Sequence, residues 1–367
     1  MKIAFDGKRF FNNSSGLGNY SRDLIRIVAN YFPENEYVLI NENQTEKGKE
    51  IVSLPQVSFV ETSKGTWSRQ LKMGKDAQLI NADIFHGLSG ELPLKWTDKS
   101  IKKVVTIHDL IFMRFPQYYS FFDRKIHLWK FKKAVEQADL IIAISEQTKR
   151  DIIQFLKVPE EKIRVVYQGC HRAFKESQSE EFLNSITEKF NLPERFILNV
   201  GTIEERKNLL NIVKAINGTK IPLVVIGKKT KYFNKVQKFL KKNKLESQVQ
   251  FLENVSMEEL AGIYKLADLF VYPSLFEGFG IPIIEALFSE TPVITGNLSC
   301  LPEAGGPDSV YIDPKNFEDI KAKINFLWNN ESERKRRARK GLQFVQKFKD
   351  ESIAKEMMSA YQSLLKN

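Results

Sequence analysis

The sequence has few of the residues that build metal centres and disulfide frameworks. Its 367 residues include two cysteines, Cys170 and Cys300, and four histidines. The cysteines lie far apart and match no metal or disulfide spacing, and the histidines share no zinc-ligand spacing. We therefore expect a reducing compartment and no zinc site.

Long hydrophobic runs are missing too. No apolar stretch approaches the roughly 18 residues of a membrane-spanning helix, and the chain opens directly with the buried-strand pattern Met1-Lys-Ile-Ala-Phe-Asp6. We therefore expect no signal peptide and a cytoplasmic protein. Positive charge is in excess, at +11. It predicts an acidic partner, which is a phosphate-bearing ligand, an anionic membrane surface or nucleic acid.

Short apolar runs alternate with helix-length amphipathic segments along most of the chain. The runs are 2–6, 37–40, 83–86, 104–108, 139–145 and 164–167, then 196–200, 223–227, 249–252, 268–274, 292–296 and 310–312. This alternation predicts an α/β protein with mostly parallel sheets. A polar stretch at about 169–194 interrupts it. We therefore predict two Rossmann-like domains whose parallel sheets face each other across a cleft.

The predicted N-terminal domain covers residues 1–175, and the predicted C-terminal domain covers residues 190–349. A last helix, at about 350–367, either completes the second domain or packs back on the first. In such sheets ligands bind outside the carboxyl ends of the strands. The motifs described next follow predicted strands and therefore fall at those ends.

One motif joins two carboxylates through a glycine-rich turn. The segment Glu277-Gly-Phe-Gly-Ile-Pro-Ile-Ile-Glu285 follows a predicted strand and opens a helix. Gly278 and Gly280 leave backbone N–H groups uncovered at the helix start, where a phosphate or sugar oxygen binds well. The carboxylates can accept hydrogen bonds from sugar or ribose hydroxyls beside it. The pattern favours a nucleotide-sugar site, and the alternative is an acidic helix start after a glycine turn.

A second motif, Gly201-Thr-Ile-Glu-Glu-Arg206-Lys207-Asn208, follows the run 196–200. It places Arg206 and Lys207 at what we expect to be an exposed helix start. A guanidinium and an ammonium beside backbone N–H groups suit a diphosphate and its leaving-group charge. The alternative is a solvated basic turn.

A third motif, Asn12-Asn-Ser-Ser-Gly16-Leu-Gly18-Asn19-Tyr20, follows the first predicted strand. Gly16 and Gly18 allow an anion to approach the helix start. The third glycine and the later acidic residue of a dinucleotide fingerprint are missing, so the motif predicts oxyanion contact rather than NAD binding. A plain turn is equally consistent with it.

His108 and Asp109 end the run 104–108 and begin the loop after it. A histidine at a strand end can contact a ligand hydroxyl or exchange protons near neutral pH. The alternative is an ordinary hydrogen-bonded histidine. His86 closes another run and is a weaker candidate for the same cleft.

The segment 112–133 is crowded with aromatic and basic residues. It predicts either a helix that packs its aromatic side chains into the core or a basic amphipathic helix that rests on an anionic bilayer. The charge run 334–340 has no interleaved aromatic residues. It is more typical of a solvated helix face than of a nucleic-acid site, so we expect no nucleic-acid partner.

Taken together, the chain resembles the family-4 retaining glycosyltransferases of GT-B fold, in particular the bacterial mannosyltransferase-like members that build surface polysaccharides. The resemblance covers nearly the whole chain. It is carried by Gly16-Leu-Gly18-Asn19-Tyr20, Ile107-His108-Asp109-Leu110, Ala138-Asp139 through Ser145, Val200-Gly201-Thr202 with Arg206-Lys207-Asn208, and Glu277 through Glu285. The last two motifs are specific when they occur together in this order, whereas the glycine pair is not.

The resemblance implies how a sugar donor is bound. Arg206 and Lys207 would hold its diphosphate and stabilise it as it departs. Glu277 would accept from a hydroxyl of the transferred sugar, and Glu285 would bind the ribose hydroxyls. Further donor contacts would come from Gly18, Gly201, Gly278, Phe279 and Gly280.

The resemblance also assigns the acceptor side to the first domain. His108 would lie beside the sugar with its carbonyl facing the developing positive charge at the anomeric carbon. The acceptor-side candidates are Gly16, Asn19, Tyr20 and Asp109. The resemblance implies an enzyme that works without a metal or another cofactor, and the relevant loops contain no Asp-x-Asp metal motif.

The implied activity is transfer of a hexose, with mannose favoured, from a nucleotide-diphosphate sugar to a saccharide or lipid-linked saccharide acceptor. A GDP-sugar is favoured over a UDP-sugar. Retention is a family inference. The sequence is also compatible with peripheral association of the protein with the inner face of the plasma membrane. The alternatives are a nucleotide-sugar epimerase, a phosphorylase-like enzyme and a non-enzymatic two-domain sugar-binding protein.

Overall fold

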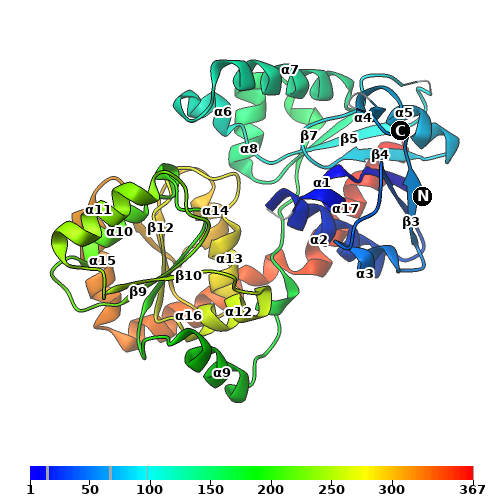
Figure 1. Cartoon of the computed structure of the whole chain (residues 1–367). Helices are drawn as coiled ribbons and strands as arrows, with labels where there is room; N and C mark the ends of the chain where they lie inside the picture. Colours follow the sequence, from blue (N-terminus) through cyan, green and yellow to red (C-terminus); the bar gives the residue numbers. More distant parts are fainter. Residues whose placement is uncertain (14–15, 66–67, 97, 367) are drawn as a thin grey trace. The chain divides into compact units, whose positions relative to one another are not determined.

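The computed structural model describes residues 1–13, 16–65, 68–96 and 98–366. The chain divides into two compact units (Figure 1). The first unit contains Met1–Gly169 together with Phe348–Asn367, and the second contains Cys170–Lys347. The last helix, α17 (Asp350–Leu365), therefore belongs to the first unit.

The first unit contains a parallel seven-stranded sheet with the order β3-β2-β1-β4-β5-β6-β7. The strands are β1 Lys2–Asp6, β2 Glu36–Asn41, β3 Val57–Glu61, β4 Ile84–Gly87, β5 Lys102–Ile107, β6 Leu140–Ala143 and β7 Ile163–Val165. The sequence analysis missed β3. This edge strand is buried at Val57 only, so its apolar signal is weak.

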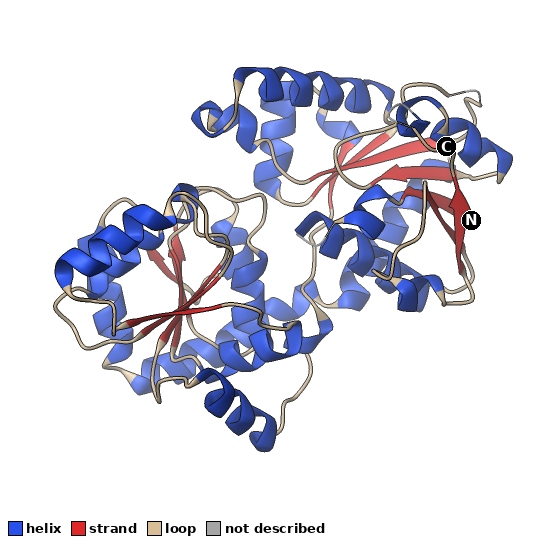
Figure 2. Cartoon of the chain, viewed as in Figure 1, coloured by secondary structure: helices blue, strands red, loops and turns tan. Residues whose placement is uncertain are grey.

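Helices cover both faces of this sheet (Figure 2). They are α1 Lys8–Asn12, α2 Gly16–Tyr31, α3 Lys49–Val52, α4 Ser68–Leu71, α5 Met73–Leu79, α6 Ile111–Arg114, α7 Phe121–Gln137, α8 Glu146–Asp151 and α17. Ser145 caps α8 by accepting a hydrogen bond from the Thr148 N–H. A π-helical turn at Ile152–Leu156 continues α8.

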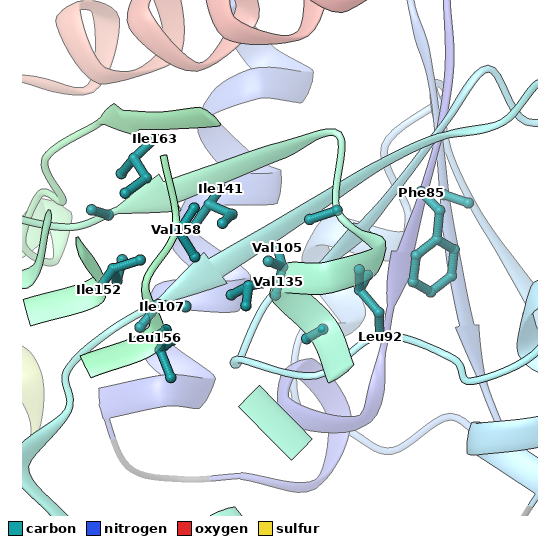
Figure 3. Close-up of a cluster of buried hydrophobic side chains, with 14 of the residues drawn as sticks. Phe85, Leu92, Val105, Ile107, Val135, Ile141, Ile152, Leu156, Val158 and Ile163 are labelled. Carbon is teal, nitrogen blue, oxygen red and sulfur yellow. The ribbon is translucent and has the colours of Figure 1, made fainter. Parts of the chain in front are cut away.

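The core of the first unit forms where α5, α7 and the π-helical turn meet one face of the sheet. Figure 3 shows Val105 and Ile107 of β5 beside Ile141 of β6 and Val135 of α7. All four are at most 5% exposed. Because strand side chains alternate between faces, the intervening residues of the same strands face α2 and α17 instead.

His86 lies on that second face, in the core. Its Nδ1 is 2.6 Å from the Tyr361 hydroxyl of α17, and its Nε2 is 2.8 Å from the Thr106 hydroxyl. The idea that His86 lines a ligand site is therefore wrong, since the ring is fully buried. The Arg26–Asp350 ion pair, at 2.7 Å, also ties α2 to α17.

The second unit contains a parallel six-stranded sheet with the order β10-β9-β8-β11-β12-β13. The strands are β8 Ile197–Val200, β9 Leu223–Ile226, β10 Val249–Leu252, β11 Leu269–Tyr272, β12 Val293–Gly296 and β13 Val310–Ile312. The helices are α9 Glu180–Phe190, α10 Leu209–Ile216, α11 Phe233–Asn243, α12 Met257–Leu266, α13 Ile281–Phe288, α14 Leu301–Gly305, α15 Phe317–Trp328 and α16 Glu331–Val345.

Both sheets are doubly wound α/β sheets, as the sequence predicts. In the first sheet the chain starts at β1 and extends to β2 on one side and to β4 on the other. In the second sheet β8 occupies the same place between β9 and β11. Loops that leave the carboxyl ends of such a strand pair diverge and open a ligand-binding crevice at the sheet edge.

Candidate functional site

The loop after β8 carries the basic pair into the crevice of the second sheet. Gly201 turns the chain with a φ of 141°, which favours glycine. A 3-10 turn at Glu205–Lys207 follows and ends at Asn208, whose φ is 63°. The Asn208 amide donates to the carbonyl of Pro273 at 3.2 Å and to that of Pro314 at 2.6 Å. Asn208 thereby ties this loop to the loops that follow β11 and β13.

Glu277, in the loop after β11, receives both basic side chains. Its Oε1 accepts from Lys207 Nζ at 2.6 Å, and its Oε2 lies 2.9 Å from Arg206 Nη1. Oε1 also accepts from the hydroxyls of Ser274 at 2.5 Å and Tyr272 at 3.0 Å. The first acid of the glycine-rich motif and the basic pair thus meet in one buried cluster, which we call the Glu277 cluster.

The charges of this cluster are held away from water. Burial alone would raise the pKa of Glu277, but Lys207 and Arg206 overcome it and hold the pKa at about 2. Burial lowers the pKa of Lys207, and Glu277 opposes that effect. The side chains of Arg206 and Lys207 are only 14% and 16% exposed. The expectation of an exposed helix start is therefore wrong, because the loop after β11 covers both.

Arg206 has a second acidic partner that is closer to solvent. Its Nη2 donates to Glu204 Oε1 at 2.5 Å, and the Glu204 side chain is 36% exposed. Its Nη1 also donates to the Phe276 carbonyl. Arg206 therefore bridges one buried and one accessible carboxylate, and only the accessible one can leave without exposing a buried charge.

The turn between Glu277 and α13 is fixed from behind by Ser299 and Cys300. The Ser299 hydroxyl donates to the Glu277 carbonyl at 3.0 Å, and the Cys300 thiol lies 3.1 Å from the same carbonyl and 3.0 Å from that of Phe279. In a trans peptide the N–H points opposite to the C=O. The N–H groups of Gly278 and Gly280 therefore point away from Cys300.

Gly280 and Phe279 have different reasons for their places in this turn. Gly280 caps α13 with a φ of 113°, a conformation that favours glycine. The Phe279 side chain is 2% exposed and belongs to the core. Phe279 can therefore contact a ligand through its backbone only.

Glu285 lies on α13, the helix that follows the glycine-rich turn, and is 7% exposed. Its Oε2 accepts from the Tyr264 hydroxyl at 3.2 Å. Burial raises its pKa to about 7, against the opposing hydrogen bond from Tyr264. Glu285 therefore differs from Glu277, because it has no basic partner among the described side chains and is close to half-protonated at neutral pH.

His108, in the first unit, lies just past the carboxyl end of β5. Its Nε2 is 2.9 Å from the Leu88 carbonyl, which only accepts, so Nε2 carries the proton. Burial lowers the pKa of His108 to about 4, against the Leu88 hydrogen bond and with a contribution from Arg9. The ring is therefore neutral at pH 7, and its Nδ1 is a hydrogen-bond acceptor. The His108 carbonyl accepts from the Thr148 hydroxyl at 3.1 Å.

The predicted acceptor-side residues separate into different environments. Tyr20 is 6% exposed, its hydroxyl is 3.1 Å from that of Thr106, and its ring meets His108 edge-on. Asp109 lies two residues before α6 and accepts from the Ile111 N–H at 3.0 Å. Asn19 accepts from Arg22 at 2.7 Å. Tyr20 thus supports His108 from the core.

The two glycines at the start of α2 also differ. A Cβ at Gly18 would come 2.0 Å from the Asn13 carbonyl, so this position needs glycine for packing whatever else it binds. Gly16 has open space around it. Ser14 and Ser15 of the same motif lie outside the described residues.

The sequence analysis missed several residues of these sites. Tyr272 ends β11 and Ser274 lies three residues before Glu277, and their place at a strand end was the available signal. Arg9 follows β1, contributes to the lowered pKa of His108, and has a buried Nε without a hydrogen-bond partner in the described part of the chain. Within the same part, no group of three His, Cys, Asp or Glu side chains is arranged to hold a metal ion.

Comparison with known proteins gives the same division of the chain. Residues 33–173 match the Glycosyltransferase Family 4 domain, and residues 181–344 match the domain described as Glycosyl transferases group 1. An O-antigen chain mannosyltransferase B of Escherichia coli is 25% identical over 99% of this chain and 100% of its own length. The O-antigen chain mannosyltransferase RfbU of Salmonella typhimurium is 29% identical over 58% of this chain and 57% of its own.

A solved structure shows the likeness in fold. A glycosyltransferase from Rickettsia africae superposes with a TM-score of 0.78, covers 100% of this chain and 99% of its own, and is 18% identical. The two family domains fall on the two doubly wound units described above. The chain therefore belongs to the glycosyltransferases of GT-B fold that combine a family 4 domain with a group 1 domain.

Proposed function

We propose that this glycosyltransferase moves a hexose, with mannose favoured, from a nucleotide-diphosphate sugar to a saccharide or lipid-linked saccharide in polysaccharide biosynthesis. The observation that carries the proposal is the Glu277 cluster, in which two mostly covered cations pair with a buried carboxylate at the switch point of the second sheet. The names of the O-antigen mannosyltransferase relatives support mannose, and with it a GDP-sugar over a UDP-sugar.

The basic pair binds the donor diphosphate. When the bond between the sugar and the diphosphate breaks, negative charge grows on the departing phosphate oxygen. Arg206 and Lys207 stabilise that charge in a poorly hydrated site, where fixed cations act strongly. Glu204 is the partner that the diphosphate replaces on Arg206, since it is the more exposed of the two carboxylates. In this scheme the two cations do the work of a metal ion, and none is required.

The carboxylates and the turn orient the rest of the donor. Glu277 has hydrogen-bond acceptor capacity beyond its contacts in the cluster and takes a sugar hydroxyl. Glu285 takes the ribose hydroxyls, for which its ionised form is the better acceptor. The N–H groups of Gly278 and Gly280, held by Ser299 and Cys300, approach sugar and phosphate oxygens.

The first unit binds the acceptor and contributes contacts to the donor. Gly18 supplies an N–H to the distal phosphate, and His108 accepts a sugar hydroxyl at its neutral Nδ1. The acceptor oxygen attacks the anomeric carbon from the face that the diphosphate leaves. The new bond from carbon to the acceptor oxygen replaces the old bond to the phosphate oxygen, and the acceptor proton passes to that phosphate. The anomeric configuration is retained.

The first test is thermal stabilisation by GDP, UDP, ADP and their sugar conjugates in the presence of EDTA. A ligand at about 100 times its dissociation constant adds roughly 2.7 kcal/mol to the unfolding free energy. We expect a selective shift with GDP and GDP-mannose. No shift with any nucleotide would contradict the proposal and favour a sugar-binding protein.

The second test distinguishes a transferase from an epimerase. Labelled GDP-mannose is incubated with the enzyme and a bacterial lipid extract, and the products are separated. Transfer releases GDP and labels the extract, and NMR of the product then gives the configuration at the anomeric carbon. Conversion of the donor to an epimer without release of GDP would overturn the proposed reaction.

A further inference from the structure

Helix α7 has an apolar face on each side. Towards the sheet, Ala134 and Val135 are buried, and Leu128 and Phe131 pack on the core cluster. Figure 1 shows α7 running beside the first sheet, with α6 near one of its ends. Such a helix needs one apolar face for packing on the sheet.

The second face is exposed. Phe122, Ile126 and Trp129 are 76%, 52% and 45% exposed, and Phe121 at the helix start is 62% exposed. Positions 122, 126 and 129 follow the i, i+4, i+7 spacing that puts side chains on one side of a helix. We call these four residues the α7 outer stripe. The expectation of a helix that buries its aromatic residues therefore describes only its inner face.

Lysine side chains flank the α7 outer stripe. Lys125 and Lys132 are exposed, and the Lys125 ammonium lies 5.4 Å from the centre of the Phe121 ring. Lys133 continues the stripe one turn beyond Trp129 and pairs with Glu136 at 2.8 Å. Residues 118–137 contain five Lys or Arg and two Asp or Glu, so the surface is positively charged.

We propose that the α7 outer stripe docks the first unit on an anionic lipid bilayer. Aromatic and aliphatic side chains mixed with lysines are the composition of a helix that lies in the plane of a membrane interface, with its rings among the acyl chains and its ammonium groups at the phosphates. A net charge of +11 adds long-range attraction to such a surface.

Two further observations favour a bilayer over other occupants. A second copy of the chain would bring the same lysines face to face in a symmetric interface, and like charges oppose that contact. The other long face of α7 is fixed to the sheet, so the helix lies flat rather than inserting. No helix of the described chain is long and apolar enough to span a membrane.

This inference goes beyond the proposed reaction, because it concerns where the enzyme acts. The docked unit is the one to which we assign the acceptor. A lipid-linked acceptor is held in a bilayer, so docking raises its local concentration at the enzyme. Docking and catalysis are separable, since none of the stripe residues belongs to the donor or acceptor sites.

The test compares binding to vesicles of phosphatidylcholine alone with binding to vesicles containing 30% phosphatidylglycerol. The variant combines Phe122→Ser, Ile126→Ser and Trp129→Ser. The matched control combines Leu79→Ser and Phe326→Ser, two side chains that are 70% and 49% exposed elsewhere. We expect the wild type and the control to co-sediment with anionic vesicles at low salt, and the partition coefficient of the stripe variant to fall at least tenfold.

Three readouts distinguish a bilayer from other occupants. Salt should weaken the wild-type binding, and brominated lipids should quench a fluorescence component that Trp129→Phe removes. All variants should bind nucleotide equally, which separates docking from the proposed reaction. Equal partition of wild type and stripe variant, binding indifferent to lipid charge, or a wild-type dimer that the stripe variant abolishes without any lipid binding would each overturn the inference.

Discussion

The two sheets have corresponding strand orders, but the crevices at their carboxyl ends differ in their electrostatics. In the second unit, the buried Glu277 carboxylate is paired with the mostly covered cations of Arg206 and Lys207. In the first unit, burial makes His108 a neutral ring held by the Leu88 carbonyl. Arg9 is a nearby cation without a hydrogen-bond partner for its buried Nε in the described chain.

This difference shows what each crevice is prepared to bind. Buried charges persist only when they are paired, and a pair arranged before the ligand arrives needs little reorganisation to receive another charged group. In our proposal, the second unit is therefore prepared for a diphosphate. A neutral imidazole with one accepting nitrogen is suited to a hydroxyl instead. The four variants below test this contrast, from the largest expected effect to the smallest.

Glu277→Gln breaks the charge balance of the second crevice. It leaves two buried cations without their carboxylate, and we expect the free energy of unfolding to fall by about 3–5 kcal/mol in urea titrations. Glu253→Gln is the control, because its partner Lys229, at 2.6 Å, lies on the surface. The free energy of unfolding of that control should fall by about 1 kcal/mol or less. Equal losses in the two variants would contradict a special role for the Glu277 cluster.

Glu285→Gln tests the carboxylate that has no basic partner. Its folded pKa of about 7 lies above its unfolded value of 4.5. The unfolded chain therefore loses this proton first, and the wild type loses stability as pH rises from about 4.5 to about 7. Replacing the carboxyl group should raise the free energy of unfolding by up to about 3 kcal/mol above pH 7. Below pH 4 it should leave the free energy of unfolding unchanged.

Urea titrations of both proteins across this pH range measure the effect of Glu285→Gln. A wild-type stability that does not differ from that of the variant at any pH would show that Glu285 is not destabilised by burial. Nucleotide affinity should fall in the variant, because an amide accepts ribose hydroxyls less strongly than a carboxylate does.

His108→Phe tests the neutral acceptor of the first crevice. Loss of one hydrogen bond to a sugar hydroxyl should lower kcat/KM about tenfold, since such a bond is worth about 1.4 kcal/mol. His108→Gln can still donate to Leu88 and should keep more activity. Because the pKa of His108 is about 4, its protonation should leave no inflection in kcat/KM between pH 5.5 and 8. A histidine-dependent inflection near pH 6.5 would contradict the neutral assignment.

Glu204→Gln should strengthen the binding of a nucleoside diphosphate rather than weaken it. The Glu204 carboxylate competes with a diphosphate for Arg206 from a partly exposed position, where such pairs are worth about 0.5 kcal/mol. Its removal should tighten nucleoside diphosphate binding about two- to threefold in calorimetric titrations at low salt. Glu205→Gln, whose partner Lys235 is 3.5 Å away and well exposed, should leave the affinity unchanged. Weaker binding in Glu204→Gln would show that Glu204 contacts the donor itself.

The sequence predicted the elements better than the contacts between them. Apolar runs located β1, β10 and β13 within their observed bounds, because these strands are short and sharply bounded. The meeting of Lys207 with Glu277 depends on β8 and β11 being neighbours, which is a property of the sheet order. No local pattern in either segment carries that information.

Burial was the other quantity that local patterns missed. A histidine at the end of a strand points into either face, and a shift of one residue decides between a ligand site and the core. His86 points to the core, whereas His108 follows its strand and reaches the crevice. On α7 the aromatic residues divide between two faces, and only the structure separates Phe131 from Trp129.

The most direct measurement of the central claim is calorimetric titration of Lys207→Met with the nucleoside diphosphate that the wild type binds, in EDTA. Lys235→Ala, an exposed lysine of the same unit, is the control. A charge-assisted contact with a phosphate is worth about 1.5–3 kcal/mol. We therefore predict that the Kd of Lys207→Met rises about 10- to 100-fold while that of Lys235→Ala stays within about twofold. An unchanged Kd in a folded Lys207→Met protein would remove the Glu277 cluster from the donor site.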